Sequence, residues 1–504
     1  MKRLLAGCLA RLLAGCLARL LAGCLACLLA CVAAAAPRHS PAALAPKPPP
    51  PAEKDTETHL PAGRFGTVTV YIPEGTPQSV AIFLSGDGGW HLGVINMART
   101  LAEMGAVVIG VDVTRYLGSL HAAAARAAQC QLIAGDFENL SHQVQKEIGM
   151  SEYHVPVLVG YSSGATVVYA SLVQSPPGTF AGALSLGFCP DQEFGGAALC
   201  PGAGLHYTQG KKDDLIFEPA KDLKQPWIAL QGQQDQVCAA AAVDEFAAGT
   251  GDSQVIKLPK VGHGFSVERN WVPQFQEAYE SIVARLNAPR ALRPPAISDL
   301  PVNEVHAEGD SDEFALLLSG DGGWAGLDRE LAARLAASGV PTVGLNSLKY
   351  FWTERSPAET AKDVARIMRH YLSTWNKKKV LLVGYSFGAD VLPFVVNRLP
   401  PDLRAAIATV TLLGFDSTAT FEVTVADWVG SADPGAPTKP EVAAMSGAPV
   451  LCIYGEGEQD SICPGLLPGK VTAERVGTGH HFGGEYGALA DKILTFARGS
   501  RPKT

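Results

Sequence analysis

The segment Gly384-Tyr385-Ser386-Phe387-Gly388 decides the fold. It follows the apolar run 380–383, which predicts a buried strand, and it precedes 389–396, whose apolar positions fit a helix. A Gly-x-Ser-x-Gly segment between a strand and a helix is typical of a nucleophile elbow, because the tight backbone turn needs small residues on both sides of the serine. We therefore expect the hydroxyl of Ser386 to stand exposed at the top of a sheet.

The same arrangement occurs earlier in the chain. Gly160-Tyr161-Ser162-Ser163-Gly164 follows the apolar run 155–159 and precedes 165–169. A single match of this kind is a weak signal, since glycine and serine are common in ordinary turns. Two copies with matching flanks are much stronger and indicate an internal duplication.

Three further motifs recur in the same order and at nearly constant spacing in both halves. They are Leu84-Ser85-Gly86-Asp87-Gly88-Gly89-Trp90 with Leu318-Ser319-Gly320-Asp321-Gly322-Gly323-Trp324, Asp235 to Cys238 with Asp460 to Cys463, and Gly262-His263-Gly264-Phe265 with Gly479-His480-His481-Phe482. Strands alternating with helical segments predict parallel sheets, and the order Ser, Asp, His is that of the α/β-hydrolase fold. We predict an α/β protein with two tandem α/β-hydrolase-like domains, 60–287 and 303–500, each a mainly parallel sheet with helices on both faces.

The remaining segments are predicted to be a signal peptide (1–36), a tether rich in proline and alanine (37–59) and a linker (288–302). Residues 3–26 are three copies of Arg-Leu-Leu-Ala-Gly-Cys-Leu-Ala, and 20–36 is uncharged and apolar, about the length of a signal-peptide core. A permanent membrane anchor is the alternative. Leu21-Ala22-Gly23-Cys24 also resembles a bacterial lipobox, so a lipid-anchored periplasmic protein stays open.

Composition excludes several classes of protein. The 504 residues are 47% hydrophobic and 18% charged with a net charge of −8, which suits large buried cores and does not favour nucleic-acid binding. Six cysteines follow residue 36, an even number that fits an oxidising compartment. Cys189 with Cys200, and Cys452 with Cys463, are plausible bridges, although sequence does not fix connectivity. No metal-like cluster is present, and we predict neither metal nor cofactor.

Serine needs an imidazole to take its proton and a carboxylate to orient that imidazole. In the second half the candidates are Ser386, His480 and Asp460. In the first half they are Ser162, His263 and Asp235. His481 competes with His480, but the matching Gly-His-x-Phe pattern favours His480.

An acyl-transfer site also needs N–H donors for the developing oxyanion. We expect one from the residue after each serine, Phe387 or Ser163, and one from the early glycine-rich loop, at Asp321 or Asp87. A carboxylate there is unusual. It either caps a turn or helix or binds a positive group, such as an ammonium on the acyl moiety.

Aromatic and basic residues at 349–355 have two interpretations. They pack a loop against the sheet, or they form a substrate-binding rim of Tyr350, Trp352 and Arg355, in which the arginine pairs with a phosphodiester.

These motifs resemble the bacterial AcvB/VirJ virulence-protein family, exported proteins with an α/β-hydrolase-like domain. The resemblance covers most of the chain after about residue 60, and the second half looks like the VirJ domain itself. It implies a periplasmic hydrolase that removes lysine or alanine from aminoacyl-phosphatidylglycerol at the membrane surface, with Ser386, Asp460 and His480 as the favoured triad.

Three functions remain open from the sequence. The first is this periplasmic serine hydrolase, which would act on an aminoacylated phospholipid. A general esterase or thioesterase with the same triad is the second. The third is a hydrolase-like secretion or binding accessory that does not turn its ligand over. The sequence leaves the oligomeric state open.

Overall fold

The computed structural model describes residues 55–91, 93–124, 130–211, 214–287, 296–309, 311–424 and 435–500. The predicted signal peptide, most of the predicted tether and residues 288–295 of the predicted linker lie outside these ranges. The first strand begins at Asp55, so the N-terminal domain starts five residues before the predicted boundary. No helix among the described residues is long and apolar enough to cross a membrane.

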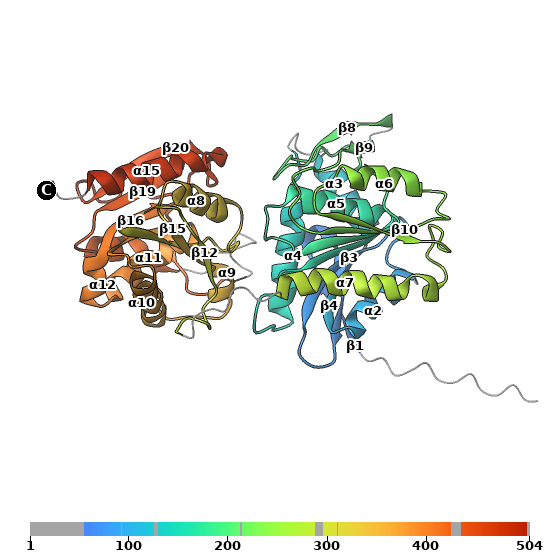
Figure 1. Ribbon diagram of the computed structural model, residues 1–504, viewed down its shortest axis with the longest axis horizontal. Helices are drawn as coiled ribbons and strands as arrows, with labels where there is room; N and C mark the ends of the chain where they lie inside the picture. Colours follow the sequence, from blue (N-terminus) through green and yellow to red (C-terminus); the bar gives the residue numbers. More distant parts are fainter. Residues whose placement is uncertain are drawn as a thin grey trace, which may run out of the picture. The chain divides into compact units, whose positions relative to one another are not determined.

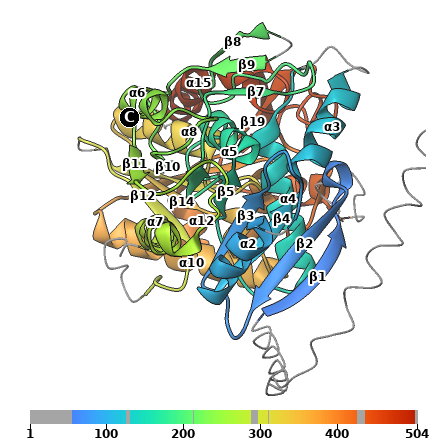
Figure 2. The same cartoon turned by 90° about the vertical axis from the view of Figure 1, so that its right-hand side faces the viewer.

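The first half is built on an eight-stranded sheet in the order β1-β2-β4-β3-β5-β6-β10-β11. Strands β1 and β2 pair antiparallel at one edge (Figure 2), and all pairs from β4 to β11 are parallel. The central strands are continuous apolar runs because both faces of a parallel sheet are covered. The strands are β1 (Asp55–Pro61), β2 (Thr67–Pro73), β3 (Ser79–Leu84), β4 (Ala106–Val111), β5 (Val157–Tyr161), β6 (Gly182–Leu186), β10 (Trp227–Gly232) and β11 (Ser253–Leu258).

Helices cover both faces of this sheet (Figure 1). Apolar residues of α2 and α7 join the core on one face, and those of α3, α4, α5 and α6 join the core on the other. A separate three-stranded sheet, β7-β9-β8, follows β6. The elements are η1 (Gly63–Phe65), α2 (Gly93–Glu103), α3 (Val113–Ala124), α4 (Ile133–Glu147), α5 (Ser163–Gln174), β7 (Asp191–Glu193), β8 (Tyr207–Gln209), β9 (Asp214–Phe217), α6 (Ala240–Ala248), η3 (Glu268–Asn270) and α7 (Val272–Asn287).

The second half repeats this plan with one strand fewer. Its sheet has the order β12-β14-β13-β15-β16-β19-β20, in which only the β12–β14 pair is antiparallel. The strands are β12 (Val302–Val305), β13 (Glu313–Leu318), β14 (Thr342–Leu345), β15 (Lys379–Tyr385), β16 (Ile407–Leu413), β19 (Val450–Glu456) and β20 (Val471–Thr478), with the short pair β17 (Thr418–Ala419) and β18 (Ala436–Pro437).

Helices α8 and α15 pack on one face of the second sheet, and α9, α10, α11, α12 and α14 contribute to the core on the other. Both halves are therefore α/β-hydrolase folds with helices on both faces, as predicted. The helices are α8 (Gly326–Ala337), α9 (Ser347–Tyr350), α10 (Pro357–Thr374), α11 (Phe387–Arg398), α12 (Pro401–Ala406), α14 (Thr438–Ala444), η4 (Phe482–Gly484) and α15 (Tyr486–Gly499).

The disulfides correct one of the two suggested bridges. Cys452 pairs with Cys463 as expected. Cys189 pairs with Cys238, and Cys200 pairs with Cys130, so a Cys189–Cys200 bridge is wrong. Residues 131 and 199, which adjoin Cys130 and Cys200 in the sequence, form a β-bridge. This bridge brings the two distant segments together.

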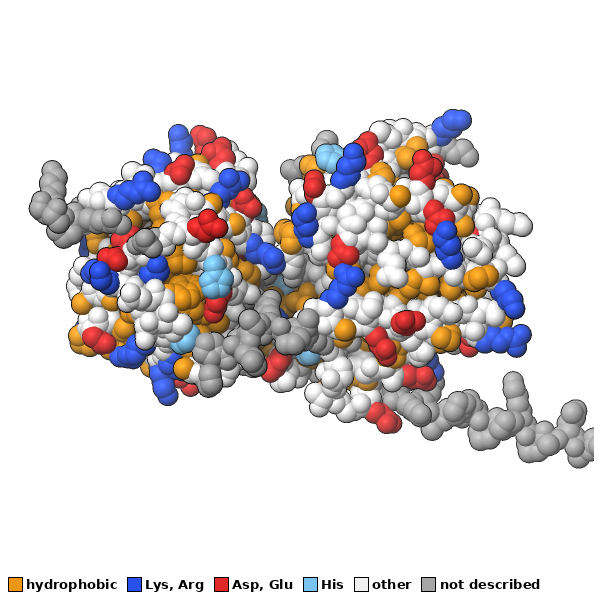
Figure 3. Space-filling view, in the orientation of Figure 1, with side chains coloured by type: hydrophobic (Ala, Val, Ile, Leu, Met, Phe, Trp, Pro, Cys, Tyr) orange, Lys and Arg blue, Asp and Glu red, His pale blue; other side chains and the backbone are white. Residues whose placement is uncertain are grey.

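Charged side chains are mixed on the face drawn in Figure 3. Lysine and arginine side chains lie among aspartate and glutamate side chains over this face rather than in one area. This distribution agrees with the weakly acidic overall composition.

Candidate active site

Both elbow serines have the strained backbone that the motif predicts. Ser162 has φ 53° and ψ −121°, and Ser386 has φ 52° and ψ −122°. Positive φ at a residue with a side chain costs about 1–3 kcal/mol and places the serine on a sharp turn between strand and helix.

Space explains the two glycines of each elbow. A Cβ on Gly384 would lie 2.5 Å from the carbonyl oxygen of Gly388, and one on Gly388 would lie 2.2 Å from that of Leu318. The pair Gly160 and Gly164 is equally confined, with its nearest backbone contacts at 2.2 and 2.4 Å. Any larger residue would push the helix away from the strand and displace the serine.

Each serine meets the histidine expected from the sequence. The Oγ of Ser386 lies 2.8 Å from Nε2 of His480, and the Oγ of Ser162 lies 2.9 Å from Nε2 of His263. Two hydrogen-bonded Ser–His pairs therefore stand at the carboxyl ends of β5 and β15, in the geometry that lets imidazole take the serine proton.

The carboxylate partner in the second half is Glu458, not Asp460. Oε1 of Glu458 lies 2.5 Å from Nδ1 of His480, and the Glu458 side chain is only 5% exposed. The reason is loop length. Counted from the glycine near each strand end, Gly455 in β19 and Gly232 in β10, Glu458 and Asp235 are both the third residue, whereas Asp460 is two residues too late.

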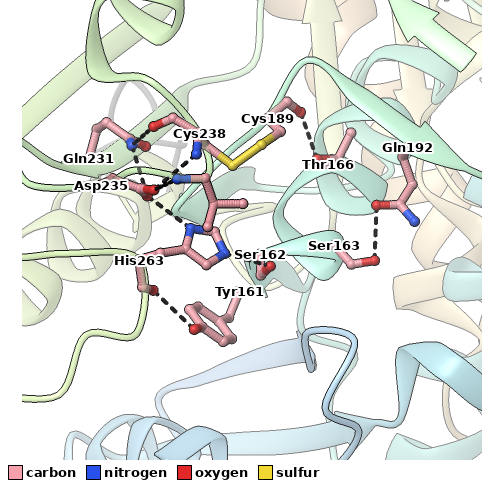
Figure 4. The surroundings of a disulfide bond; sticks show 11 residues. Tyr161, Ser162, Ser163, Thr166, Cys189, Gln192, Gln231, Asp235, Cys238 and His263 are labelled. Carbon is pink, nitrogen blue, oxygen red and sulfur yellow. Dashed lines mark hydrogen bonds and ion pairs between the residues drawn. A yellow bond between two sulfur atoms is a disulfide. The ribbon is translucent and has the colours of Figure 1, made fainter. Parts of the chain in front are cut away.

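The first-half acid is Asp235, as predicted. Its Oδ2 lies 2.9 Å from Nδ1 of His263 and accepts a hydrogen bond from Nε2 of Gln231 at 3.2 Å. Its Oδ1 accepts the backbone N–H groups of Val237 and Cys238 at 2.8 and 2.9 Å. Figure 4 shows His263 between this fully buried carboxylate and Ser162.

Hydrogen bonds keep both acids ionised despite burial. Burial alone would raise the pKa of Asp235, but the N–H of Cys238, the His263 ring and the N–H of Val237 outweigh it, so its pKa lies below the ordinary value. The pKa of Glu458 is likewise lowered, with burial opposed by His480 and by the N–H of Gly455. Each acid can therefore hold its imidazole in the tautomer that exposes Nε2 to serine.

His481 plays a different part from His480. Its Nδ1 lies 2.8 Å from the hydroxyl of Tyr385, the residue before the elbow serine. Burial and the charge of His480 lower the pKa of His481. The equivalent Tyr161 donates to the carbonyl of His263 at 3.0 Å, so this tyrosine fastens the histidine loop in both halves.

The glycine-rich loops are fastened at both ends. The hydroxyl of Ser319 accepts the backbone N–H of Ser347 at 2.9 Å, and that of Ser85 accepts the N–H of Val113 at 3.0 Å. The tryptophan that ends each motif lies against a glycine of the neighbouring strand. An added Cβ on Gly344 would lie 2.0 Å from the ring of Trp324, and the same clash arises at Gly110 with Trp90. These contacts hold the loop beside its serine, where the predicted second oxyanion donor lies.

The predicted oxyanion residues have different side-chain environments. Phe387 and Ser163 begin α11 and α5, and first-turn N–H groups have no acceptor within a helix. Asp321 is half-buried, and its Oδ1 accepts the N–H of Gly322 at 3.1 Å, which matches a turn role. Asp87 is exposed.

Carboxyl groups gather around the second-half serine. Asp390 lies in the first turn of α11, and its Oδ1 accepts the N–H of Asp416 at 2.8 Å. Burial raises the pKa of Asp390 well above its ordinary value. The hydrogen bond from the N–H of Asp416 lowers this pKa, but the charges of Asp416, Asp321 and Glu458 raise it further. Burial and the neighbouring negative charges therefore favour the uncharged form of Asp390.

The first half has no carboxyl group at the positions of Asp390 and Asp416. Thr166 occupies the position of Asp390, and its hydroxyl donates to the carbonyl of Cys189 at 2.7 Å. Cys189 in turn occupies the position of Asp416 and is in a disulfide. The signal available in the sequence is a change from acid to uncharged residue at these two matched positions.

The predicted aromatic rim is wrong. Tyr350 is 2% exposed, and its hydroxyl donates to Asp363 at 2.8 Å. Trp352 is equally buried in the core. Arg355 is half-buried, with its guanidinium over the Tyr350 ring at 5.1 Å. These residues pack a loop against the sheet, because large aromatic rings gain more from burial than from exposure at a rim.

Two glycines that the sequence reading passed over make room for the imidazoles. Gly414 (φ 61°) follows β16, and an added Cβ would lie 2.8 Å from Cε1 of His480. Gly187 (φ 63°) follows β6 and approaches His263 in the same way, at 3.3 Å. A glycine at the end of the strand after the elbow was the signal available in the sequence.

Within the described part of the chain, one group of possible metal ligands coincides with the first triad. Asp235, Cys238 and His263 lie within 4.8 Å of one another. The sulfur of Cys238 is bonded to Cys189, so it offers no thiolate. The hydrogen bonds already described account for the arrangement.

Fold and site together define a tandem α/β-hydrolase with a serine, histidine and acid constellation in each half. A sequence profile described as "Bacterial virulence protein (VirJ)" matches residues 78–180 and 312–500, more than half of the chain. The chain belongs to this family.

Solved structures with similar coordinates each match about half of the chain. The esterase domain of a Rhodothermus marinus protein is 13% identical (TM-score 0.32) and covers 45% of this chain and 98% of its own. A Thermogutta terrifontis esterase with propionate bound is 15% identical (TM-score 0.33) and covers 48% of this chain and 98% of its own. A lidless α/β serine hydrolase from Xanthomonas campestris is 18% identical (TM-score 0.30) and covers 49% of this chain and 100% of its own. No curated protein matches the sequence.

Proposed function

We propose that the second half is a periplasmic serine hydrolase that cleaves the aminoacyl ester of aminoacyl-phosphatidylglycerol. The observation that carries this proposal is the hydrogen-bonded chain Ser386–His480–Glu458 in an α/β-hydrolase fold of the VirJ family. A chain of this kind has a chemical use in acyl transfer and none in simple binding, which favours an enzyme over a binding accessory.

In the proposed reaction, His480 removes the proton of Ser386 as Oγ attacks the ester carbonyl. The N–H of Phe387 and an N–H of the loop around Asp321 stabilise the oxyanion, each contributing about 3 kcal/mol. His480 then protonates the departing glycerol oxygen, and the aminoacyl group remains on Ser386. Water then attacks the acyl-serine and gives a proton to His480. The bond to Ser386 Oγ breaks, and His480 returns the proton to Oγ as the free amino acid leaves.

The acidic environment supports an aminoacyl substrate. An amino acid linked through its carboxyl group carries its α-ammonium one carbon from the reacting carbonyl. Asp321 and Asp416 lie in the loops around the serine, and their charges already act on Asp390. Anionic groups near the serine attract such a cation and strengthen its binding in the partly buried site.

Export to the periplasm is part of the proposal. Three disulfides among the described residues suit an oxidising compartment. The repeated apolar segment at the N-terminus fits a signal peptide.

The test uses purified full-length protein and vesicles containing lysyl- or alanyl-phosphatidylglycerol, with free amino acid as the readout. Ser386→Ala should abolish release, by 1,000-fold or more, because the nucleophile is lost. Ser373→Ala, an exposed serine on α10, is the matched control and should leave release unchanged.

Other outcomes point to the alternatives. Hydrolysis of short acyl esters without release from the lipids would favour a general esterase or thioesterase. Vesicle binding without release would favour a secretion or binding accessory.

A further inference from the structure

We infer that the first half is a second, separately working hydrolase site that acts on uncharged carboxylic esters. The VirJ match reaches only residue 180 in this half, so it includes Ser162 but neither His263 nor Asp235. The inference concerns a different serine from the one proposed above and does not depend on the lipid substrate.

The catalytic arrangement of the first half is complete and better shielded than that of the second. The His263 side chain is 18% exposed, against 42% for His480, and Asp235 is fully buried. Asp235 accepts three hydrogen bonds besides the one from His263. A relic without function has no requirement to keep a buried, fully hydrogen-bonded acid against its serine and histidine.

The disulfide Cys189–Cys238 joins the two loops that frame the site. Cys238 donates its N–H to Asp235, and Cys189 lies in the loop after β6, where its carbonyl accepts the hydroxyl of Thr166 (Figure 4). The covalent link therefore fixes the acid loop relative to the elbow helix α5. Such fixed positioning of the reacting groups is what acyl transfer requires.

The surroundings suit a neutral substrate. Thr166 and Cys189 stand where the second half has Asp390 and Asp416, so the carboxylate of Asp416, whose charge acts near Ser386, has no counterpart near Ser162. Asp87 is exposed. The buried carboxylate of Asp235 faces His263.

Apolar side chains lie on the segments around this site. Val237, between Asp235 and Cys238, is 67% exposed. Val267 in the histidine loop and Ile216 in β9 are also exposed. β9 pairs with β7, whose Gln192 accepts a hydrogen bond from the hydroxyl of Ser163 at 2.9 Å. Exposed aliphatic groups on the segments that carry Asp235 and His263 favour an acyl chain over a charged amino acid.

The chemistry balances without a cofactor. Ser162 Oγ bonds to the ester carbonyl while His263 takes its proton. The carbon–oxygen bond to the alcohol breaks, and His263 gives the proton to that alcohol. Water then adds to the acyl-serine, loses a proton to His263 and displaces Ser162, which recovers its proton as the carboxylic acid leaves.

The experiment compares full-length Ser386→Ala with the double variant Ser386→Ala/Ser162→Ala, using p-nitrophenyl butyrate as a neutral ester and lysine p-nitrophenyl ester as a cationic one. The single variant should retain butyrate hydrolysis and lose most lysyl-ester hydrolysis. Adding Ser162→Ala should lower butyrate hydrolysis at least 100-fold. Ser171→Ala, a buried serine on α5 that donates to Val167, is the matched control for the effect of the substitution on folding.

Labelling with a fluorophosphonate, followed by peptide mass spectrometry, gives an independent readout. Adducts are expected at both Ser162 and Ser386. Absence of an adduct at Ser162 in the folded protein, together with butyrate hydrolysis that Ser162→Ala does not change, would overturn this inference. That result would leave the proposed lipid hydrolysis by Ser386 standing. Unsubstituted protein that hydrolyses butyrate through Ser162 but releases no amino acid from the lipids would overturn the proposed function and leave this inference standing.

Discussion

The two halves share one sheet plan and one order of catalytic residues, but they hold the acid differently. Asp235 is a short side chain, fixed by two backbone N–H groups and Gln231. Glu458 is one methylene longer and accepts the backbone N–H of Gly455 at 2.9 Å. The duplicated fold thus fixes the position of the carboxylate against Nδ1 of the histidine. The residue that supplies the carboxylate, and the length of its loop, differ between the halves.

The difference extends to the surroundings of each serine. The second half places Asp390 and Asp416 beside the elbow, and the first half has Thr166 and a disulfided Cys189 there. A duplicated site can therefore keep its reacting atoms while the charge around them changes.

The largest expected effect concerns the acid of the second half. Glu458→Ala should lower hydrolysis by Ser386 about 1,000- to 10,000-fold, because the imidazole loses its orienting partner. Asp460→Ala should change the rate less than about 3-fold, since Asp460 is not the partner of His480. Steady-state kinetics on the purified variants decides between them. If Asp460→Ala lowered the rate more than Glu458→Ala, Asp460 would be the acid of the second half, as the Asp-x-x-Cys alignment predicts. Glu458 would then not be the counterpart of Asp235.

A smaller effect is expected on the pH dependence of stability in the first half. Burial of His142 in α4 lowers its pKa from 6.5 to about 3, so the folded protein keeps it neutral while the unfolded chain takes up a proton below pH 6.5. Stability contributed by the neutral ring is present above pH 6.5 and is lost as the pH falls towards 3, by about 2 kcal/mol at pH 5.

His142→Gln should remove that loss. Urea unfolding at pH 7 and at pH 5 gives the unfolding free energy at each pH, and the difference between the two free energies measures the loss. The buried Asp390 of the second half has a raised pKa, so its contribution has the opposite sign and weakens the fold as the pH rises. An unchanged pH dependence in His142→Gln would contradict this contrast.

The smallest expected effect tests charge at the second site. Asp321→Asn should lower kcat/KM for a lysyl ester about 5-fold, equivalent to about 1 kcal/mol for a half-exposed charge pair, with a much smaller loss for its N-acylated, uncharged analogue. Equal losses for both esters would mean that Asp321 serves only the turn in which it accepts the N–H of Gly322.

Much of the fold followed from sequence because the signals were local. Glycines on either side of Ser162 and Ser386 have no room for a side chain, and the apolar strands are buried on both faces. The histidines also followed, since Gly-His-x-Phe recurs intact and the structure places both rings against their serines.

The errors came from features that local patterns do not encode. The Asp-x-x-Cys pattern favours Asp460, but the loop before Cys463 is two residues longer than the loop before Cys238, so the acid position shifts to Glu458. The Cys130–Cys200 bridge depends on a contact between distant segments. Tyr350 and Trp352 have an aromatic composition that suits either a core or a rim, and only packing decides between them.

Trp324 packs against Gly344, a strand residue without a side chain, and this contact limits which substitutions the site tolerates. Gly344 belongs to β14, whose neighbour β13 leads into the loop that carries Asp321. The ring of Trp324, at the end of that loop, lies directly against Gly344. A single methyl group at position 344 would lift the indole and, with it, the amides beside Ser386, without touching a catalytic side chain. Silencing by such a remote substitution would leave all three catalytic residues intact in the sequence, so a motif search would still count the site as active.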